Sequence, residues 1–263
     1  MKVIILTTSV HGTAGHHLPH LFNSRYVEIV KVVVSEGAKP GSGGLLKKIK
    51  KIAKIGFFGA VNGVKMRKWY KEDVNKYCDV GNAKEFCRQH NIPFETVPYT
   101  NSAETQNIFK QSGADIGLSL GNGYISPKVF GIPRYGMLNI HHEILPRYQN
   151  AQSIIWELYN GSSETGYTIH KIDKHIDTGE IVLQEKLPII FRDTLADTVA
   201  YNYARLFDAS ANGLVRVFDN FDQYFFNARP QGNGEKYTTP SLRQFLKISR
   251  QFKKLKKAAG NNK

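Results

Sequence analysis

Short apolar runs alternate along the chain with segments of helical periodicity. Residues 2–8 and 28–35 are rich in β-branched residues, which is typical of buried parallel strands, and a helix is predicted over 17–22 between them. The same alternation continues, with strands over 94–97, 116–120 and 137–140 and helices over 83–90, 105–111 and 127–130. It predicts an α/β fold with a doubly wound, mostly parallel sheet and helices on both faces.

The C-terminal part has a different pattern. A long helix is predicted over 194–218, with Leu195, Val199, Tyr203, Leu206 and Leu214 on one side, where it would cover the sheet. A turn-rich stretch over 230–237 then precedes a basic amphipathic helix from Leu242 onward. We therefore expect a main domain over 1–220 and a short C-terminal extension over 221–263.

An excursion separates the second predicted strand from the rest of the sheet. Pro40 to Gly44 is a Gly/Ser/Pro loop, and the helix after it carries lysines on one face and apolar residues on the other, namely Leu45, Leu46, Ile49, Ile52 and Ile55. Glycines 56, 59 and 63 interrupt this pattern, and a second helix is predicted over 66–77. The simplest interpretation packs the apolar face on the body. A polyanionic substrate or a membrane surface are the alternatives for the basic face.

The charge is concentrated in two segments. The chain has 36 Lys and Arg against 22 Asp and Glu, a formal net charge of +14. Ten basic residues lie between 37 and 71 and eight between 243 and 263, and neither segment contains an acidic residue. The remaining 18 basic and 22 acidic residues leave the rest of the chain at −4. The basic character therefore belongs to the excursion and the tail.

Several classes of protein are excluded by composition. Cys78 and Cys87 are too few for a disulfide scaffold or a Cys-based zinc site, and we expect both in the core. No apolar run is long enough to span a bilayer, and residues 1–10 fit a first strand better than a signal peptide. We expect a cytoplasmic protein, with peripheral membrane contact through the basic segments left open.

The candidate chemistry lies between residues 137 and 181. Alternation along the strand places Asn139 and His141 on one face with Ile140 on the other, and Asp177 follows in an Asp-Thr-Gly turn. A lone histidine is more often structural, but an amide, an imidazole and a carboxylate together can move protons while polarising a carbonyl. The glycine loop 121–124 follows a predicted strand and is either a pocket wall or a simple turn. The first loop, 11–15, lacks Gly-x-Gly-x-x-Gly, which argues against an NAD(P) dehydrogenase.

A set of motifs over roughly residues 1–215 resembles the 10-formyltetrahydrofolate-dependent formyltransferase family. The residues that carry the resemblance are Gly123 to Pro127, Leu138 to His141, Leu145 to Tyr148, Trp156, Asn160-Gly161, Glu164 to Gly166 and Asp177 to Gly179. The resemblance implies a formyltransferase-type, Rossmann-like fold and 10-formyltetrahydrofolate as the formyl donor, with no metal. It also implies catalytic roles for Asn139, His141 and Asp177. The folate pocket would be lined by Asn122, Gly123, Tyr124, Ile125, Lys174, His175 and Ile176.

These roles agree with the chemistry of formyl transfer to an amine. The tetrahedral intermediate needs donors for its oxyanion, which Asn139 and a protonated His141 can supply. Asp177 is expected to orient the imidazole or a water and to relay the amine proton. Two residues depart from the family pattern: Asn150 stands where family members usually have glycine, which we expect to affect the acceptor side, and His142 adds a second imidazole beside the motif.

The acceptor is the least determined part of the function. Asp177-Thr178-Gly179 resembles the tRNA and sugar branches more than the purine branch, and the extension over 221–263 is short for the barrel that tRNA-directed members add. We expect an N-formyltransferase acting on a nucleotide-linked deoxyamino sugar for surface glycan biosynthesis. Methionyl-tRNA formyltransferase is the alternative, because +14 also suits an RNA-binding enzyme, so tRNA stays open as a partner. A non-catalytic basic binding module is the second alternative, and a homodimer is left open.

Overall fold

The computed structural model describes residues 1–37 and 44–260, so positions 40–43 of the predicted loop 40–44 lie outside the described residues, and Gly44 begins a helix. Within 44–54 it describes the side chains of residues 49, 52 and 53 only. Seven strands of the described chain form one sheet: β1 (Lys2–Thr7), β2 (Glu28–Gly37), β3 (Phe94–Tyr99), β4 (Ile116–Ser119), β5 (Met137–His141), β6 (Glu164–Lys171) and β7 (Ile181–Pro188).

The order of the strands is β3-β2-β1-β4-β5-β6-β7. Strands β1 to β5 pair in parallel, while β6 runs antiparallel to β5 and β7 antiparallel to β6. The order reverses between β1 and β4, which is the point where open α/β sheets bind ligands at the carboxyl ends of their strands. The predicted doubly wound, mostly parallel sheet is confirmed.

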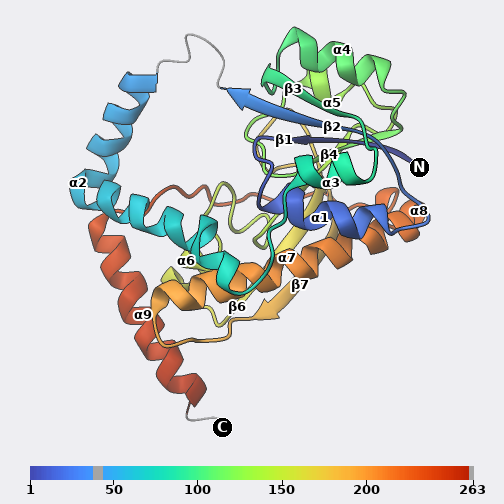
Figure 1. Ribbon diagram of the computed structural model, residues 1–263. Helices are drawn as coiled ribbons and strands as arrows, with labels where there is room; N and C mark the ends of the chain where they lie inside the picture. Colours follow the sequence, from blue (N-terminus) through green and yellow to red (C-terminus); the bar gives the residue numbers. More distant parts are fainter. Residues whose placement is uncertain (38–43, 261–263) are drawn as a thin grey trace.

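Helices cover both faces of the sheet (Figure 1). They are α1 (Thr13–Phe22), α3 (Ala83–Gln89), α4 (Ala103–Gln111), α5 (Pro127–Phe130), α6 (Ile155–Tyr159), α7 (Leu195–Asp219) and α8 (Phe221–Phe225). A hydrophobic core lies on each face of the sheet, and alternate residues of β1 contribute to the two cores. Val3 and Ile5 pack beneath α1 and α7, whereas Ile4 and Leu6 pack beneath α4 and α5. The predicted long helix is α7, whose Val199, Leu206 and Leu214 are buried on the sheet.

The basic excursion forms one long helix, α2 (Gly44–Lys71), broken at Gly56 by a non-helical backbone with φ of 76°. The predicted interruption at Gly56 is confirmed, but Gly59 and Gly63 lie inside the helix and a second helix does not start at 66. The α-helix ends at Lys71, and a 3₁₀ turn, η1 (Asp73–Lys76), follows. The glycines at 59 and 63 do not break the helix because the chain 239–241 packs closely against them.

The prediction for the apolar face of this helix is partly wrong. Ile55 is buried, but Ile49 and Ile52 are exposed. The side chains of Leu45 and Leu46 lie outside the described residues. The face that packs on the body in the second part of α2 is instead formed by Gly59, Gly63 and Met66, as judged by their close neighbours and burial.

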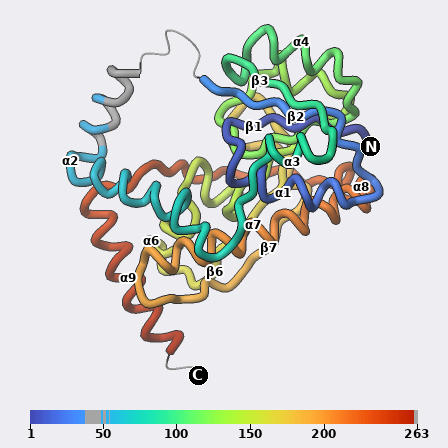
Figure 2. Tube along the Cα trace, viewed as in Figure 1, coloured from blue at the N-terminus to red at the C-terminus, as the bar shows by residue number. Residues whose placement is uncertain are grey.

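Residues 226–241 run past β7 and the loop at Gln149, with bridges from Arg229 to Ile181 and from Lys236 to Gln149. They lead into α9 (Leu242–Gly260), the predicted amphipathic helix. Its buried Ile248 and Phe252 join the core beneath α7, and α9 packs against α2 and α6. The trace in Figure 2 shows α9 and α2 on the same side of the molecule, opposite α8.

Both cysteines are unpaired, as free thiols. Cys87 is a core residue as predicted, whereas Cys78 is only half-buried at the edge of a small cluster under α7. Among the residues described, no helix has both the length and the apolar composition that a bilayer crossing requires.

Candidate functional site

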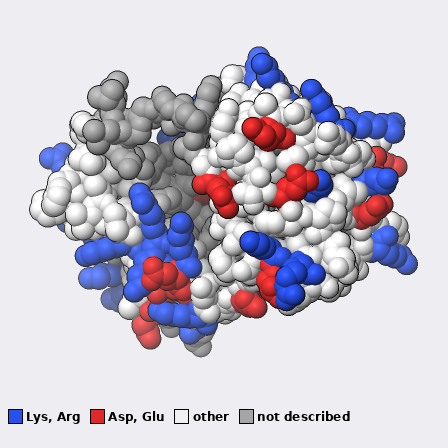
Figure 3. All heavy atoms as spheres, turned by 45° about the horizontal axis from the view of Figure 1, so that its top comes forward, with Lys and Arg blue, Asp and Glu red and all other residues white. Residues whose placement is uncertain are grey.

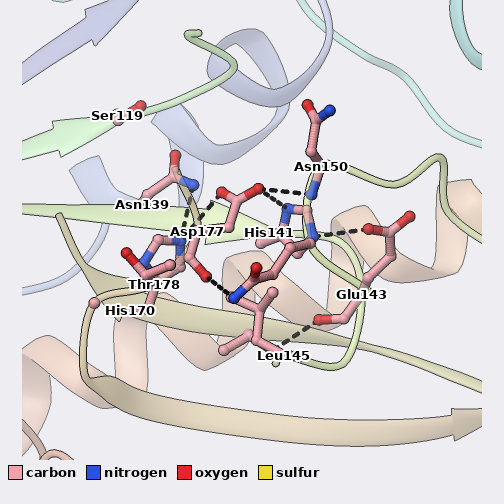
Figure 4. Close-up of polar contacts among 12 residues, drawn as sticks. Ser119, Asn139, His141, Glu143, Leu145, Asn150, His170, Asp177 and Thr178 are labelled. Atoms are coloured by element: carbon pink, nitrogen blue, oxygen red, sulfur yellow. Dashed lines mark hydrogen bonds and ion pairs between the residues drawn. The ribbon is translucent and has the colours of Figure 1, made fainter. Parts of the chain in front are cut away.

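The three predicted catalytic residues come together at the carboxyl end of β5 (Figure 4). Asn139 and His141 are half-buried on one face of the strand, and Ile140 is buried on the other. Asp177 reaches them from the loop between β6 and β7. Strand alternation explains the first pair, and the loop that follows the antiparallel partner strand supplies the carboxylate.

Asn139 is held by a histidine from the neighbouring strand. The antiparallel pairing of β5 and β6 places His170 directly opposite Asn139. Nδ1 of His170 lies 2.9 Å from the carbonyl oxygen of Lys171, which can only accept, so Nδ1 carries the proton and Nε2 is an acceptor. The amide nitrogen of Asn139 therefore donates to Nε2 of His170 at 3.1 Å, and its second hydrogen is free to point elsewhere.

His141 is held by Tyr148 and Glu143. Its Nε2 lies 2.7 Å from the carbonyl oxygen of Tyr148 and 2.7 Å from Oε2 of Glu143. Both partners are acceptors, so Nε2 carries a hydrogen and Nδ1 faces Asp177, whose Oδ2 is 3.8 Å away. The short contacts that hold this imidazole come from Glu143 and Tyr148, and an orienting role for Asp177 toward the imidazole or a water stays a prediction.

The buried carboxylate beside His141 decides its charge. Burial alone would lower the pKa of His141, but the charge of Glu143, with a smaller contribution from Asp177, outweighs burial and raises this pKa to about 9. Glu143 is almost fully buried, and neither of its carboxylate oxygens has a hydrogen bond of good geometry among the residues described, although Oε2 lies 2.7 Å from Nε2 of His141. Burial therefore raises its pKa to about 7 although His141 opposes the shift. The pair favours an imidazolium at the pocket near neutral pH.

Asp177 is positioned by its own backbone and by Asn150. Both residues have left-handed backbones, with φ of 57° at Asp177 and 52° at Asn150. The backbone N–H of Asn150 donates to Oδ2 of Asp177 at 3.0 Å, and the side-chain amide of Asn150 donates to the carbonyl oxygen of Tyr237 at 3.0 Å. Glycine adopts this conformation without cost and asparagine more readily than most residues. Asn150 can thus replace the usual glycine while it adds a bond to the C-terminal residues.

The loop that carries Asp177 closes on itself. Asp173 accepts from the hydroxyl of Thr178 at 2.7 Å and from the backbone N–H of His175 at 2.9 Å. Gly179 passes close to β6, since a Cβ there would lie only 1.8 Å from the carbonyl oxygen of Lys171. The Asp-Thr-Gly turn therefore needs its glycine for this close approach.

A pocket opens in front of the trio. Six of the seven residues predicted to contact folate line it, namely Asn122, Gly123, Tyr124, Ile125, His175 and Ile176. The seventh, Lys174, lines a neighbouring hollow that also contains Tyr124 and Lys236. Asn122 also has a structural bond, because its amide donates to the carbonyl oxygen of Leu6 at 2.6 Å.

Two further hollows adjoin this pocket on the side of α2. One lies beyond β1 and β4 and is lined by the loop 8–13, Lys71 and Tyr203, and it shares Gly121 with the pocket of the trio. The other is lined by Arg67, Lys71 and residues 151–153, and it shares Ala151 with that pocket. The pocket of the trio thus continues toward a basic region. No group of three or more metal-ligating side chains occurs within residues 1–37 and 44–260.

His142 does not belong to the pocket. Its side chain is buried on the α7 side, where its Nε2 lies 3.2 Å from the hydroxyl of Ser210, and Nε2 of His17 lies 2.9 Å from the same hydroxyl. Burial lowers the pKa of His142 to about 3, with His141 and His16 adding to the shift. The second imidazole of the motif is therefore a neutral core residue.

Sequence reasoning missed His170 and Glu143. The signal for Glu143 was present, because a carboxylate two residues after His141 can reach the imidazole at a strand end. His170 could not be assigned without the register of β5 and β6, which places it opposite Asn139.

The fold and geometry can be compared with known proteins. A family model described as formyl transferase matches residues 1–218. Methionyl-tRNA formyltransferase from Thermosynechococcus vestitus is 32% identical over 163 residues, which are 61% of this chain and 47% of that protein. The chain spans about half the length of the curated relatives it matches.

Solved structures show the same fold at lower identity. An N-formyltransferase from Helicobacter canadensis, in complex with folinic acid and dTDP-3-aminofucose, aligns with a TM-score of 0.59 at 16% identity over 96% of this chain and 80% of that one. Glycinamide ribonucleotide transformylase 1 from Symbiobacterium toebii aligns with a TM-score of 0.55 at 16% identity over 85% of this chain and 88% of that one. With a family model covering most of its length, this chain belongs to the formyl transferase family.

Proposed function

We propose that this chain is an N-formyltransferase that moves the formyl group of 10-formyltetrahydrofolate to the amine of a nucleotide-linked deoxyamino sugar, in surface glycan biosynthesis. The observation that carries the proposal is the convergence of Asn139, a protonated His141 and Asp177 on one pocket in a member of the formyl transferase family. The methionyl-tRNA formyltransferase named above is similar over its matched part and makes that reaction the alternative.

The pocket fits a flat, partly polar donor. Tyr124 and Ile176 line it although they are 46% and 47% exposed, so an apolar ring placed between them would cover surface that the protein itself leaves open. The backbone of Gly121 and Gly123 forms a wall without side chains. When bound, 10-formyltetrahydrofolate supplies an activated formyl group on its N10 nitrogen.

Two donors are placed for the oxyanion that develops on the formyl oxygen. Nε2 of His141 is occupied by Tyr148 and Glu143, so the proton on Nδ1 of the imidazolium is the one available to the pocket. The side-chain amide of Asn139 donates one hydrogen to His170, and its second hydrogen is available to the formyl oxygen. A positive donor held in a buried site acts on developing charge without reorganisation, and one such donor is worth roughly a hundred- to a thousand-fold in rate.

Asp177 is placed to accept the proton of the attacking amine and to donate it to the leaving nitrogen. As the amine nitrogen forms its bond to the formyl carbon, the Asp177 carboxylate accepts the proton that the nitrogen must lose. The same proton is then delivered to the leaving nitrogen as its bond to the formyl carbon breaks, so that charge and atoms balance. The Asn150 N–H holds Oδ2 at 3.0 Å, while Oδ1, which lies 3.8 Å from Nε2 of His170, is the oxygen that would take part in this transfer.

A phosphate-bearing acceptor fits the basic hollows beside the trio. Arg67 and Lys71 line the hollow that meets the pocket at Ala151, and Lys71 also lines the hollow that meets it at Gly121. Two cations on the approach to the pocket favour an anionic group such as a nucleoside diphosphate. The structure of the Helicobacter canadensis N-formyltransferase contains a sugar nucleotide of this class, which supports the choice.

The test is an acceptor screen with the purified chain. It would be incubated with 10-formyltetrahydrofolate and a panel of nucleotide-linked amino sugars, and separately with methionyl-tRNA, while tetrahydrofolate release and formylated product are measured by mass spectrometry. We expect product with at least one amino sugar and none with methionyl-tRNA. Product with methionyl-tRNA alone would replace the sugar assignment, and folate binding without product from any acceptor would favour the non-catalytic binding module.

A further inference from the structure

Helix α2 carries large apolar side chains on its outward face. Phe57 is 70% exposed, Phe58 is 62% exposed, and Val61 and Val64 are also exposed. We call these four residues the α2 apolar stripe. Isolated exposed apolar residues are ordinary, but four of them within eight positions of one helix form a surface that lacks a partner within the described chain.

The packing of α2 explains why the stripe faces outward. Positions 59, 63 and 66 lie on the opposite side of the helix from 57, 61 and 64 at 3.6 residues per turn. A Cβ at Gly63 would lie 2.7 Å from Cγ2 of Thr239, and one at Gly59 would lie 3.1 Å from the carbonyl oxygen of Pro240. The helix is therefore seated through its glycines, a fit that cannot be made with the stripe turned inward.

Cations border the stripe. Lys65 and Lys68 are exposed one turn further along α2 and lie on the same side of the helix as the stripe at 3.6 residues per turn. Arg243 at the start of α9 is also exposed, but it follows the chain that packs on the glycine side of α2. Neither segment, 37–71 or 243–263, contains an acidic residue. Figure 3 shows Lys and Arg, with a few Asp and Glu among them, beside an uncharged surface on the side of the molecule that carries α2 and α9 in Figure 1, and further Lys and Arg on the opposite side.

We propose that the α2 apolar stripe and the cations beside it dock the protein on a lipid bilayer with anionic headgroups. Apolar side chains flanked by lysine and arginine suit the boundary between acyl chains and headgroups, where the rings enter and the cations remain with the phosphates. A second copy of the chain suits the surface less, because a symmetric contact would place the two basic segments against each other. A nucleic acid would match the cations but would leave the phenylalanines and valines without a role.

The proposed docking does not depend on the proposed reaction. It has a geometric consequence for it, however, because Arg67 and Lys71 at the end of the same helix line the hollows beside the trio. A bilayer under α2 would bring the acceptor side of the pocket near the membrane surface.

Vesicle co-sedimentation tests the apolar part of the surface. The full chain would be mixed with vesicles of phosphatidylcholine alone and with vesicles of equal parts phosphatidylcholine and phosphatidylglycerol. We expect binding to the anionic vesicles only, and partitioning about tenfold weaker or less for the Phe57→Ser/Phe58→Ser variant. Phe226→Ser is the matched control, because Phe226 is 62% exposed at the end of α8, on the far side of the molecule, and its loss should leave binding unchanged.

A second pair of variants tests the charges. Lys65→Gln/Lys68→Gln should weaken partitioning about 20-fold, since each cation near an anionic surface contributes on the order of a fivefold gain. Lys110→Gln/Lys128→Gln removes the same charge from exposed positions on α4 and α5 and should cause a loss of less than about threefold.

Three results would overturn the proposal. The first is no binding of the wild-type chain to anionic vesicles. The second is equal loss in the Phe57/Phe58 and Phe226 variants. The third is a wild-type dimer that light scattering shows becoming a monomer in Phe57→Ser/Phe58→Ser, because a second copy would then be the occupant of the stripe. Circular dichroism would establish that each variant is folded.

Discussion

His141 and His142 are adjacent in the chain but belong to two regions built in different ways. On the pocket side, His141 lies between the carboxylates of Glu143 and Asp177. On the α7 side, His142 and His17 share the hydroxyl of Ser210 and pack against aromatic rings, and no carboxylate of the described residues pairs with His142. His142 is buried and His141 is only slightly exposed, yet the pKa of His141 is raised to about 9 and that of His142 is lowered to about 3.

The difference shows that burial does not determine the charge of an imidazole in this protein. Burial disfavours the imidazolium in both regions, and a carboxylate within hydrogen-bond distance reverses the outcome in only one. The strand alternation that separates the two side chains thus converts neighbouring residues into one cationic donor and one neutral core residue.

The largest effect is expected from removing the pocket groups themselves. Asp177→Asn or His141→Gln should lower kcat/KM for formyl transfer by about a thousandfold or more, because each removes a proton acceptor or an oxyanion donor. Initial rates with the acceptor found in the screen would measure this. Near-normal rates for His141→Gln would mean that the charged imidazole of the pocket has no catalytic role.

Glu143→Gln tests the cause of the raised pKa. In the wild-type enzyme, His141 loses its proton as pH rises through about 9, so kcat/KM should fall on that basic limb. Without the Glu143 charge, the pKa of His141 should move toward its ordinary value of about 6.5, and the basic limb should shift to lower pH by about two units or more. At pH 8 the variant should be about tenfold or more slower. The measurement is a pH profile of kcat/KM.

The control for this shift is another buried carboxylate. Glu157 is fully buried in α6 and accepts a hydrogen bond from Thr165 at 3.1 Å, with no short contact to His141. Glu157→Gln should leave the basic limb in place even where stability changes. An equal shift in both variants would show that a general change in packing, and not the Glu143 contact, moves the pKa.

His142→Phe sharpens the comparison from the α7 side. We expect kcat/KM at pH 8 to stay within about threefold, because this ring does not reach the pocket. The folded state keeps His142 neutral while the unfolded state takes up a proton below about pH 6.5, so wild-type stability should fall as pH drops from 7 to 5. Between pH 7 and pH 5, the free energy of unfolding should decrease by about 2 kcal/mol less in the variant than in the wild type. Urea unfolding at the two pH values measures the difference, and an unchanged pH slope would contradict it.

The smallest effect is expected at Asn150. Asn150→Gly keeps the left-handed backbone and the N–H that holds Asp177, and it loses only the bond to Tyr237, so activity should change less than about threefold. Asn150→Val should cost about tenfold or more, because a β-branched residue disfavours this conformation. Steady-state rates of the two variants would be compared, and equal rates would show that the backbone conformation at 150 does not hold Asp177.

Most of the fold could be predicted from local pattern. Strands β1 to β5 and the long helix α7 are found where apolar periodicity placed them, because each buries a regular face, whereas β6 and β7 were not predicted. The prediction was wrong for the apolar face of α2, where Gly59 and Gly63 make contacts with residues 239–241 that are far away in sequence. A helix can pack closely through its glycines, and a pattern of large apolar residues does not reveal such a contact face.

The site could be predicted in part for a similar reason. Asn139, His141 and Asp177 belong to motifs that can be read along the chain, and the structure brings their side chains to one pocket. The partners that hold them depend on register and loop geometry, as with His170 opposite Asn139 and Glu143 against His141. Such contacts are tertiary, and the shift of the His141 pKa that follows from them cannot be predicted before the folded positions of these residues are known.

Residues 229–237, just before α9, form hydrogen bonds with the two loops of the site, at residues 149–150 and 179–181. Tyr237 bonds Gln149 and Asn150 through its backbone, Gln231 bonds the carbonyl oxygen of Gly179 at 2.6 Å, and Arg229 pairs with Ile181. A ribosome making this protein completes the trio at Asp177, some fifty residues before residues 229–237 are translated, and adds Asn139 and His141 some ninety residues before them. Acquisition of activity should therefore be timed by residues 229–237, and a nascent chain that already contains the whole trio would still lack a competent pocket.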